Sequence, residues 1–320
     1  MRVPVVDLGM DLDQPTAAST VSGRSYTRTR PRGFAEWKPR RETAVLIAQV
    51  QAILEEYRDH LPMTGRQIFY RSVAAYGYPK TEAAYERLLE HLVRARRARM
   101  IPMGAIRDDS GADYYAGGYQ GPAEFWRTMR SRGEWYQHDP TAGQPQVLEL
   151  WVEAAGMVPM IGQVAVDYGV STFSGGGFSS VTGKYDAAAR ISQRRRPTTV
   201  LVIGDYDPSG LSIMDAAAED VTEFTIDLGG RRPRYVHLAV TPDQIARYQL
   251  PTAPQKARDR RGEVMAETVQ AESLSPTQLV SILRQGLEDH LDLDALAAAR
   301  HRTEVERAEI LEELDRLGLE

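Results

Sequence analysis

The sequence predicts a multidomain α/β protein with a helical N-terminal unit, a central part built on buried strands, and C-terminal helices. The apolar run at 200–203 has the composition of a buried strand, and a Pro/Gly turn and a helical segment follow it. A second strand candidate occupies residues 147–153. The length of 320 residues suggests two domains, and the 42% of hydrophobic residues is enough to build two cores.

The first half of the chain predicts three amphipathic helices and a β-hairpin. The helices span residues 42–60, 64–75 and 81–99, and Thr64 is the expected cap of the second. An Asp-Asp-Ser-Gly turn within residues 100–115 is typical of a hairpin. Three helices and a hairpin make a winged helix, a variant of the helix-turn-helix DNA reader. The expected domains are a flexible basic arm (1–41), the winged helix (42–140), and a strand-bearing domain with a C-terminal helical extension (145–320).

Charge is divided unevenly along the chain, whose formal net charge is -5. The first 140 residues contain more Lys and Arg than Asp and Glu, whereas the remainder is acidic. Arginines of the third helix lie beside its apolar face, which suits contact with DNA phosphates, although a solvated charged face is an equally good interpretation. These candidate DNA-binding residues are Arg87, Arg94, Arg96, Arg97 and Arg99.

Carboxylates follow both strand candidates. Because alternate side chains of a strand point the same way, Asp205 and Asp207 are expected to project to one side. Glu153 ends the other strand, whereas Glu149 shares its face but lies inside the strand. Such oxygen ligands suit Mg²⁺, which one or two carboxylates usually hold together with water and substrate phosphate. We therefore expect an Mg²⁺ site at Glu153, Asp205 and Asp207, with a solvated acidic turn as the alternative.

Two motifs carry a resemblance to a known family. A Glu at one strand end and the pattern DxDPxG at a later one, residues 205–210, resemble the Toprim domain of topoisomerases, primases and related nucleases. Residues 64–71, TGRQIFYR, resemble the winged-helix motif of the topoisomerase VI A subunit and of the related transesterase that initiates meiotic recombination. The likeness covers about residues 42–275. It implies a Rossmann-like Toprim fold and a DNA-cleaving tyrosine, Tyr70. Arg66 and Arg71, near Tyr70 on the same helix, are candidates to bind the phosphate or stabilise the phenolate, with solvated surface arginines as the alternative.

The resemblance also implies chemistry and partners. Family members cut double-stranded DNA with Mg²⁺, forming a 5′-phosphotyrosyl bond and a free 3′-hydroxyl. They act as homodimers in which the tyrosine of one protomer meets the carboxylates of the other. Strand passage would need a separate GHKL-type ATPase subunit, because this chain has no Walker A sequence. The family's Gly-rich loop continues into Pro-Asp, whereas the loop here continues into Ser-Ser-Val-Thr, with Lys184 as a candidate phosphate contact.

Other functions stay open at this stage. A hydrolytic nuclease would use metal-activated water in place of tyrosine, and a non-catalytic DNA-binding module would keep the acidic cluster as a structural feature. Primase-type polymerisation is disfavoured because there is no zinc-binding module. The absence of cysteine excludes disulfides and thiolate zinc sites. No apolar run reaches membrane-spanning length, so we expect a cytoplasmic, nucleoid-associated protein.

Overall fold

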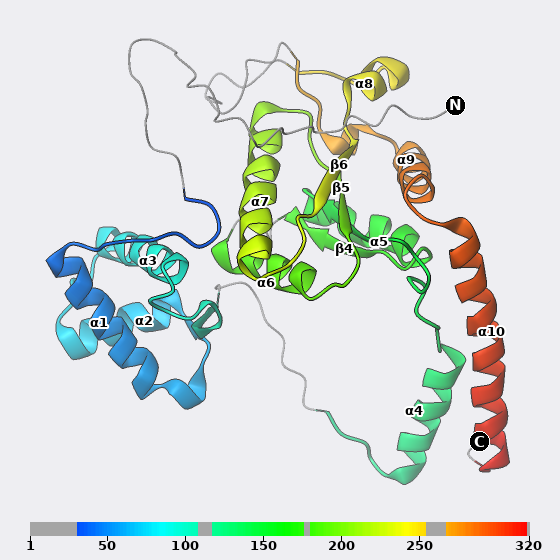
Figure 1. Cartoon of the computed structure of the whole chain (residues 1–320), viewed down its shortest axis with the longest axis horizontal. Helices are drawn as coiled ribbons and strands as arrows, with labels where there is room; N and C mark the ends of the chain where they lie inside the picture. The colour runs from blue at the N-terminus through cyan, green and yellow to red at the C-terminus, as the bar shows by residue number, and fades with distance from the viewer. Residues whose placement is uncertain (1–30, 108–116, 176–179, 254–266, 319–320) are drawn as a thin grey trace.

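A computed structural model describes residues 31–107, 117–175, 180–253 and 267–318. It has a mixed α/β fold in which a helical unit lies beside a sheet that carries helices on both faces (Figure 1). Two further helices run side by side at the edge of the molecule, away from the sheet (Figure 1). Among the described helices, none combines the length and apolarity that crossing a membrane requires.

The helical unit consists of α1 (Arg41–Glu56), α2 (Gly65–Tyr76) and α3 (Glu82–Arg97) around one apolar core. All three predicted helices are confirmed. The predicted cap is confirmed too, because Thr64 accepts a hydrogen bond from the Gln67 amide while the Gln67 side chain accepts one from the Thr64 amide. The first helix ends earlier than expected, in a 3₁₀ turn at Arg58–His60.

The expected hairpin is described only in its first part. A 3₁₀ turn at Met103–Ala105 precedes β2 (Ile106–Arg107), which pairs in parallel with β1 (Met63–Thr64). The first hairpin strand, expected from residue 100, therefore begins later and has a parallel neighbour. The predicted turn at 108–111 lies outside the described residues.

The larger sheet has four parallel strands in the order β4-β3-β5-β6. These strands are β3 (Val147–Val152), β4 (Ser171–Ser174), β5 (Thr198–Ile203) and β6 (Arg234–Ala239). The two predicted strands, β3 and β5, are the central pair. Every residue of β5 is buried, as expected for a parallel strand covered on both faces.

Helices form a layer on each face of this sheet (Figure 1). The apolar cluster on one face includes residues of α5 (Val158–Val166) and α9 (Pro276–Glu288). The cluster on the other face includes residues of α6 (Val181–Ser192) and α7 (Pro208–Asp227). Met103 and Phe34 also pack into this second cluster, so the helical unit and the α/β unit share apolar contacts.

The pair of helices at the edge of the molecule joins distant parts of the sequence. α4 (Pro122–Glu134) packs against α10 (Leu293–Arg316), and the approach is so close that a Cβ on Gly133 would lie 3.1 Å from Ile310. Beyond α4, the Tyr136 hydroxyl donates to Glu306 at 2.6 Å. The winged-helix domain expected at 42–140 includes α4 and Tyr136, but these pack against the C-terminal helix α10. The short helix α8 (Pro242–Tyr248) follows β6.

Candidate functional site

The predicted carboxylates converge at the ends of the two central strands. Val152 and Ile203 are register partners, and the Glu153 amide extends the pairing by donating to the Ile203 carbonyl at 2.9 Å. The Glu153 carboxylate then accepts a hydrogen bond of 2.9 Å from the Asp205 amide. The predicted association of Glu153 with the segment that carries Asp205 and Asp207 is therefore present in the fold.

Three glycines make room for Glu153, two beside its carboxylate and one against its backbone. A Cβ on Gly204 would lie 2.8 Å from Glu153 Oε2, and one on Gly210 would lie 3.0 Å from the same atom. A Cβ on Gly175 would approach the Glu153 Cα to 2.8 Å. These distances are shorter than ordinary van der Waals contacts, so any larger residue at these positions would displace the glutamate.

Backbone amides orient the two aspartates in different directions. Asp205 Oδ1 accepts from the Ala271 amide at 2.8 Å, whereas Asp207 Oδ1 caps α7 by accepting from the Gly210 amide at 2.6 Å. Tyr206, the residue between the two aspartates, is held by a pair of backbone hydrogen bonds with Val269. Within the described residues, no group of three or more His, Asp or Glu side chains is arranged so that it could hold a metal ion. The carboxylates are neighbours, and one oxygen of each accepts a hydrogen bond from a backbone amide.

Negative charge accumulates at this end of the sheet. Burial raises the pKa of Glu153, and the carboxylates of Asp205, Asp207 and Glu272 raise it further, whereas the hydrogen bond from the Asp205 amide opposes the rise. A divalent cation would relieve this repulsion. The donor chemistry fits Mg²⁺, since that ion binds oxygen ligands and is usually held by one or two carboxylates and water. Glu153 and Asp205 are the residues best placed to hold it, with Asp207 beside them.

Glu149, the competing candidate, has a structural role. It is fully buried and accepts hydrogen bonds from Arg190 at 2.8 and 3.1 Å, from Arg194 at 2.6 Å and from the Trp151 indole at 3.0 Å. Burial alone would raise the pKa of Glu149, but these arginines outweigh it and lower that pKa. Because two cations already neutralise the Glu149 carboxylate, it is a poor choice of metal ligand.

Tyr70 lies on the surface of α2, and 46% of it is exposed. Its ring contacts Phe69 edge-on, and Lys80 Nζ lies 5.6 Å from the ring centre. Two shallow depressions flank it, and both are lined by Tyr70 and Arg66. The first also contains Arg71, which donates to the Tyr57 hydroxyl at 3.2 Å.

His60, which the sequence pattern did not single out, also lines the first depression. Tyr70 is thus an exposed hydroxyl among basic side chains. The residues that line both depressions come from the helical unit alone, and the carboxylate cluster is not among them.

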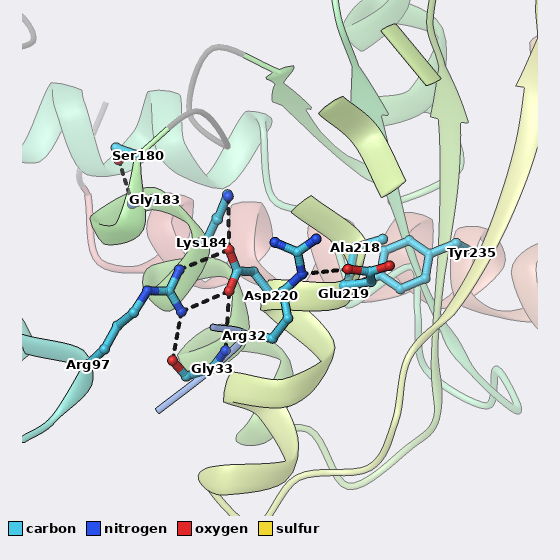
Figure 2. A network of polar contacts seen from close by, with 10 residues as sticks. All are labelled: Arg32, Gly33, Arg97, Ser180, Gly183, Lys184, Ala218, Glu219, Asp220 and Tyr235. Carbon is cyan, nitrogen blue, oxygen red and sulfur yellow. Dashed lines mark hydrogen bonds and ion pairs between the residues drawn. The ribbon is translucent and has the colours of Figure 1, made fainter. Parts of the chain in front are cut away.

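Three predicted DNA-binding residues prove to be buried, which corrects their expected surface position. Arg97 Nη1 lies 2.8 Å from Asp220 Oδ1 and Arg97 Nη2 lies 2.9 Å from Oδ2, while Lys184 Nζ lies 3.0 Å from Oδ2 (Figure 2). Arg96 donates to the Thr182 hydroxyl at 2.8 Å. Arg97 and Arg96 join α3 to α7 and α6, whereas Lys184 pairs with Asp220 within the α/β unit. None of the three cations is exposed for contact with phosphates.

The other predicted DNA-binding arginines are exposed. Arg87 projects from α3, and Arg94 pairs with Glu90 one helical turn away. Arg99 follows the helix in a left-handed conformation with φ 58°, and its guanidinium stacks over the Phe34 ring at 3.8 Å. Arg87 and Arg94 therefore remain candidates for phosphate contact, whereas Arg99 is engaged in packing.

Sequence comparisons do not assign the chain to a family. It matches no protein-family model and no curated protein. What points to function is therefore the arrangement of its own side chains. Sequence reasoning missed Gly204 and Glu272, which lie beside Glu153, and Asp220, which pairs with Arg97 and Lys184. A glycine directly after a buried strand was the available signal for Gly204, since glycine there often marks a close approach by another group.

Proposed function

We propose that this protein is a DNA-cleaving transesterase of the topoisomerase VI A-subunit type, with a tyrosine-bearing winged helix and a Toprim metal centre. The observation that carries the proposal is the convergence of Glu153 with Asp205 and Asp207 at the ends of neighbouring parallel strands. The exposed Tyr70, with Arg66 and Arg71 lining the same depression, supports it. Double-stranded DNA is the proposed substrate.

The proposed reaction exchanges one phosphodiester for another. The Tyr70 hydroxyl gives up its proton, its oxygen bonds to the scissile phosphorus, and the bond from phosphorus to the 3′ oxygen breaks. That oxygen takes up a proton, so no oxidant or co-reactant is consumed. Arg66 and Arg71 bind the phosphate and stabilise the phenolate. When bound, Mg²⁺ supplies charge neutralisation at the phosphate and at the leaving oxygen.

The position of Tyr70 favours a reaction between two chains. The helical unit contacts the α/β unit through Arg96 and Arg97 on α3 and through Met103, not through the surface of α2 that exposes Tyr70. We therefore propose a homodimer in which Tyr70 of each protomer meets the carboxylates of its partner. Strand passage by such a dimer would need a separate GHKL-type ATPase.

The decisive experiment asks whether DNA becomes linked to the protein. Internally labelled duplex is incubated with Mg²⁺, stopped with SDS and run on a denaturing gel. Label should migrate with the wild-type protein and with Tyr76→Phe, a control on the same helix with a similarly exposed ring. Label should be lost with Tyr70→Phe, with Asp205→Asn and with a chelator. Protein-linked label that persists in Tyr70→Phe would refute the assignment of the nucleophile.

A mixing experiment tests the proposed exchange between protomers. Neither Tyr70→Phe nor Asp205→Asn should cut alone, but a heterodimer of the two retains one complete site. The mixture should therefore form protein-linked nicks without double-strand breaks. Continued inactivity of a mixture whose heterodimers are demonstrated by tagged pull-down would argue against a site shared between chains.

A hydrolytic nuclease is the second candidate. It is favoured by the fact that the carboxylate cluster is built entirely within the α/β unit, whereas the depressions beside Tyr70 contain none of its residues. In that case metal-activated water attacks the phosphorus. DNA would be cut without linked protein, and Tyr70→Phe would cut as well as the wild type.

A further inference from the structure

A short stretch of chain before α1 lies between α3 and α7. Arg32 pairs with Glu219, and the Gly33 amide donates to Asp220 at 3.2 Å (Figure 2). One residue further on, the Phe34 amide donates to Asp227 at 3.0 Å. Contact is so close that a Cβ on Gly33 would lie 2.7 Å from the Glu223 Cβ. Residues 32–34 are thus seated on a row of acidic side chains.

The order of these contacts gives the direction of the chain. Going backward from Phe34 to Arg32, the partner on α7 changes from Asp227 to Asp220 and then to Glu219. The segment therefore runs parallel to α7, in the same N-to-C direction. Extended backward from Arg32, this direction leads toward the N-terminal end of α7, where Asp207 caps the helix beside the carboxylate cluster.

The acidic row continues in that direction. Asp215 lies one helical turn before Glu219, and no described residue forms a hydrogen bond or ion pair with its carboxylate. Burial raises the pKa of Asp215, and the charge of Glu219 raises it further. Among the described residues, this half-buried carboxylate has no cationic partner, and an unpaired buried charge is costly.

The preceding sequence supplies such partners at suitable spacing. Residues 24–31 read RSYTRTRP, with arginines at 24, 28 and 30. Pro31 disfavours a helical conformation of the residue before it and so favours continuation as an extended chain. Asp215 lies about 6 Å from Glu219 along the helix axis, and two extended residues cover about 7 Å, so Arg30 falls opposite Asp215.

We propose that the acidic row on α7 is a docking surface for the chain's own basic arm, residues 24–31. Arg30 pairs with Asp215, and the arginines before it extend toward the end of α7 that carries Asp207. The distance from Glu219 to that end is about 18 Å, which five or six extended residues span, so the arm is long enough to reach it. This docking is independent of the proposed cleavage activity.

Nitroxide spin labels can test the docking on the full chain, because the protein has no cysteine of its own. One label replaces Thr29, which leaves every arginine in place, and the other replaces Ile213, an exposed residue on α7. The control pair is Thr29 with Val305, an exposed residue on α10. Electron spin resonance distance measurements should give a single narrow, short distance for the first pair and a broad distribution for the control.

Charge removal then tests the stated contact. Asp215→Asn should broaden the distance between the labels at 29 and 213, and so should high salt, since the contact is electrostatic. Glu304→Gln, which removes an exposed acid on α10, should leave that distance unchanged. Two results would overturn the proposal. One is a broad distribution of the distance between labels at 29 and 213 when the acidic row is unmodified. The other is a narrow distribution that neither Asp215→Asn nor high salt alters.

Discussion

Replacing Asp220 with Asn should separate the stabilising effect of the buried charge network from that of ordinary surface pairs. The Asp220 side chain is fully buried, and it neutralises Arg97 and Lys184, whose side chains are 7% and 6% exposed. Asn preserves the size of the side chain but leaves two cations buried without a counter-charge. Removing one partner of a buried pair typically costs about 3–5 kcal/mol.

The matched control is Glu90→Gln, which removes the acid from the exposed pair between Arg94 and Glu90 on α3. Exposed pairs at this spacing contribute about 0.3–0.5 kcal/mol. Urea unfolding of both variants, followed by circular dichroism, gives the change in the free energy of unfolding. A loss below about 1 kcal/mol for Asp220→Asn would refute the claim that this network holds the two units together, because such a loss is no larger than that of a surface pair.

The pH dependence gives a second test of the same residue. Burial alone would raise the pKa of Asp220, but the hydrogen bonds and charges of Arg97 and Lys184 outweigh it and lower that pKa. Because the folded value lies below the unfolded one, the stabilisation is complete above about pH 4 and is lost as the pH falls through the folded pKa. The difference between the wild type and Asp220→Asn should therefore be constant at neutral pH and shrink in acid.

Three further substitutions test the site and its supports. Gly204→Ala places a methyl group against the Glu153 carboxylate, so it should weaken Mg²⁺ binding in a calorimetric titration, whereas Gly156→Ala, with open space around it, should not. Thr64→Ala removes the capping box of α2 and should cost about 1 kcal/mol of unfolding free energy in urea. Glu149→Gln should cost about 3–5 kcal/mol in the same assay, because it leaves two arginines without their shared acid.

The parts of the fold that could be predicted from sequence are those with a local signal. The central strand β5 is apolar along most of its length, and Pro208 and Gly210, expected to form a turn behind it, lie instead in the first turn of α7. The end of the apolar strand indicated where Asp205 and Asp207 lie, and the end of the other strand selected Glu153 over Glu149. Strand alternation does not describe the two aspartates, because β5 ends at Ile203 and their side chains accept hydrogen bonds from different parts of the backbone. By contrast, β4 has the sequence STFS and lies at the sheet edge, where no buried apolar run marks it.

The roles of the arginines could not be predicted, because helical periodicity identifies one buried face and says nothing of a second. Leu88 and Leu92 face the core of the helical unit, and that pattern alone makes Arg97 a surface residue. Its partner Asp220 lies 123 residues away in sequence and becomes adjacent only when α3 packs on α7.

The sequence did contain a signal for Asp220, an acid that lies close to the apolar residues Ala218 and Val221 of a helix. A buried carboxylate requires a cation, and a surplus of arginine on another helix supplies it. The same reasoning applies to Glu149, an acid inside an otherwise apolar strand, which proves to be paired with Arg190 and Arg194. Asp220 and Glu149, which lie inside apolar elements, mark packing contacts, whereas Asp205 and Asp207, which follow the end of an apolar strand, mark the candidate site. The position of a carboxylate relative to the end of its element, more than its residue type, is what separates the two roles.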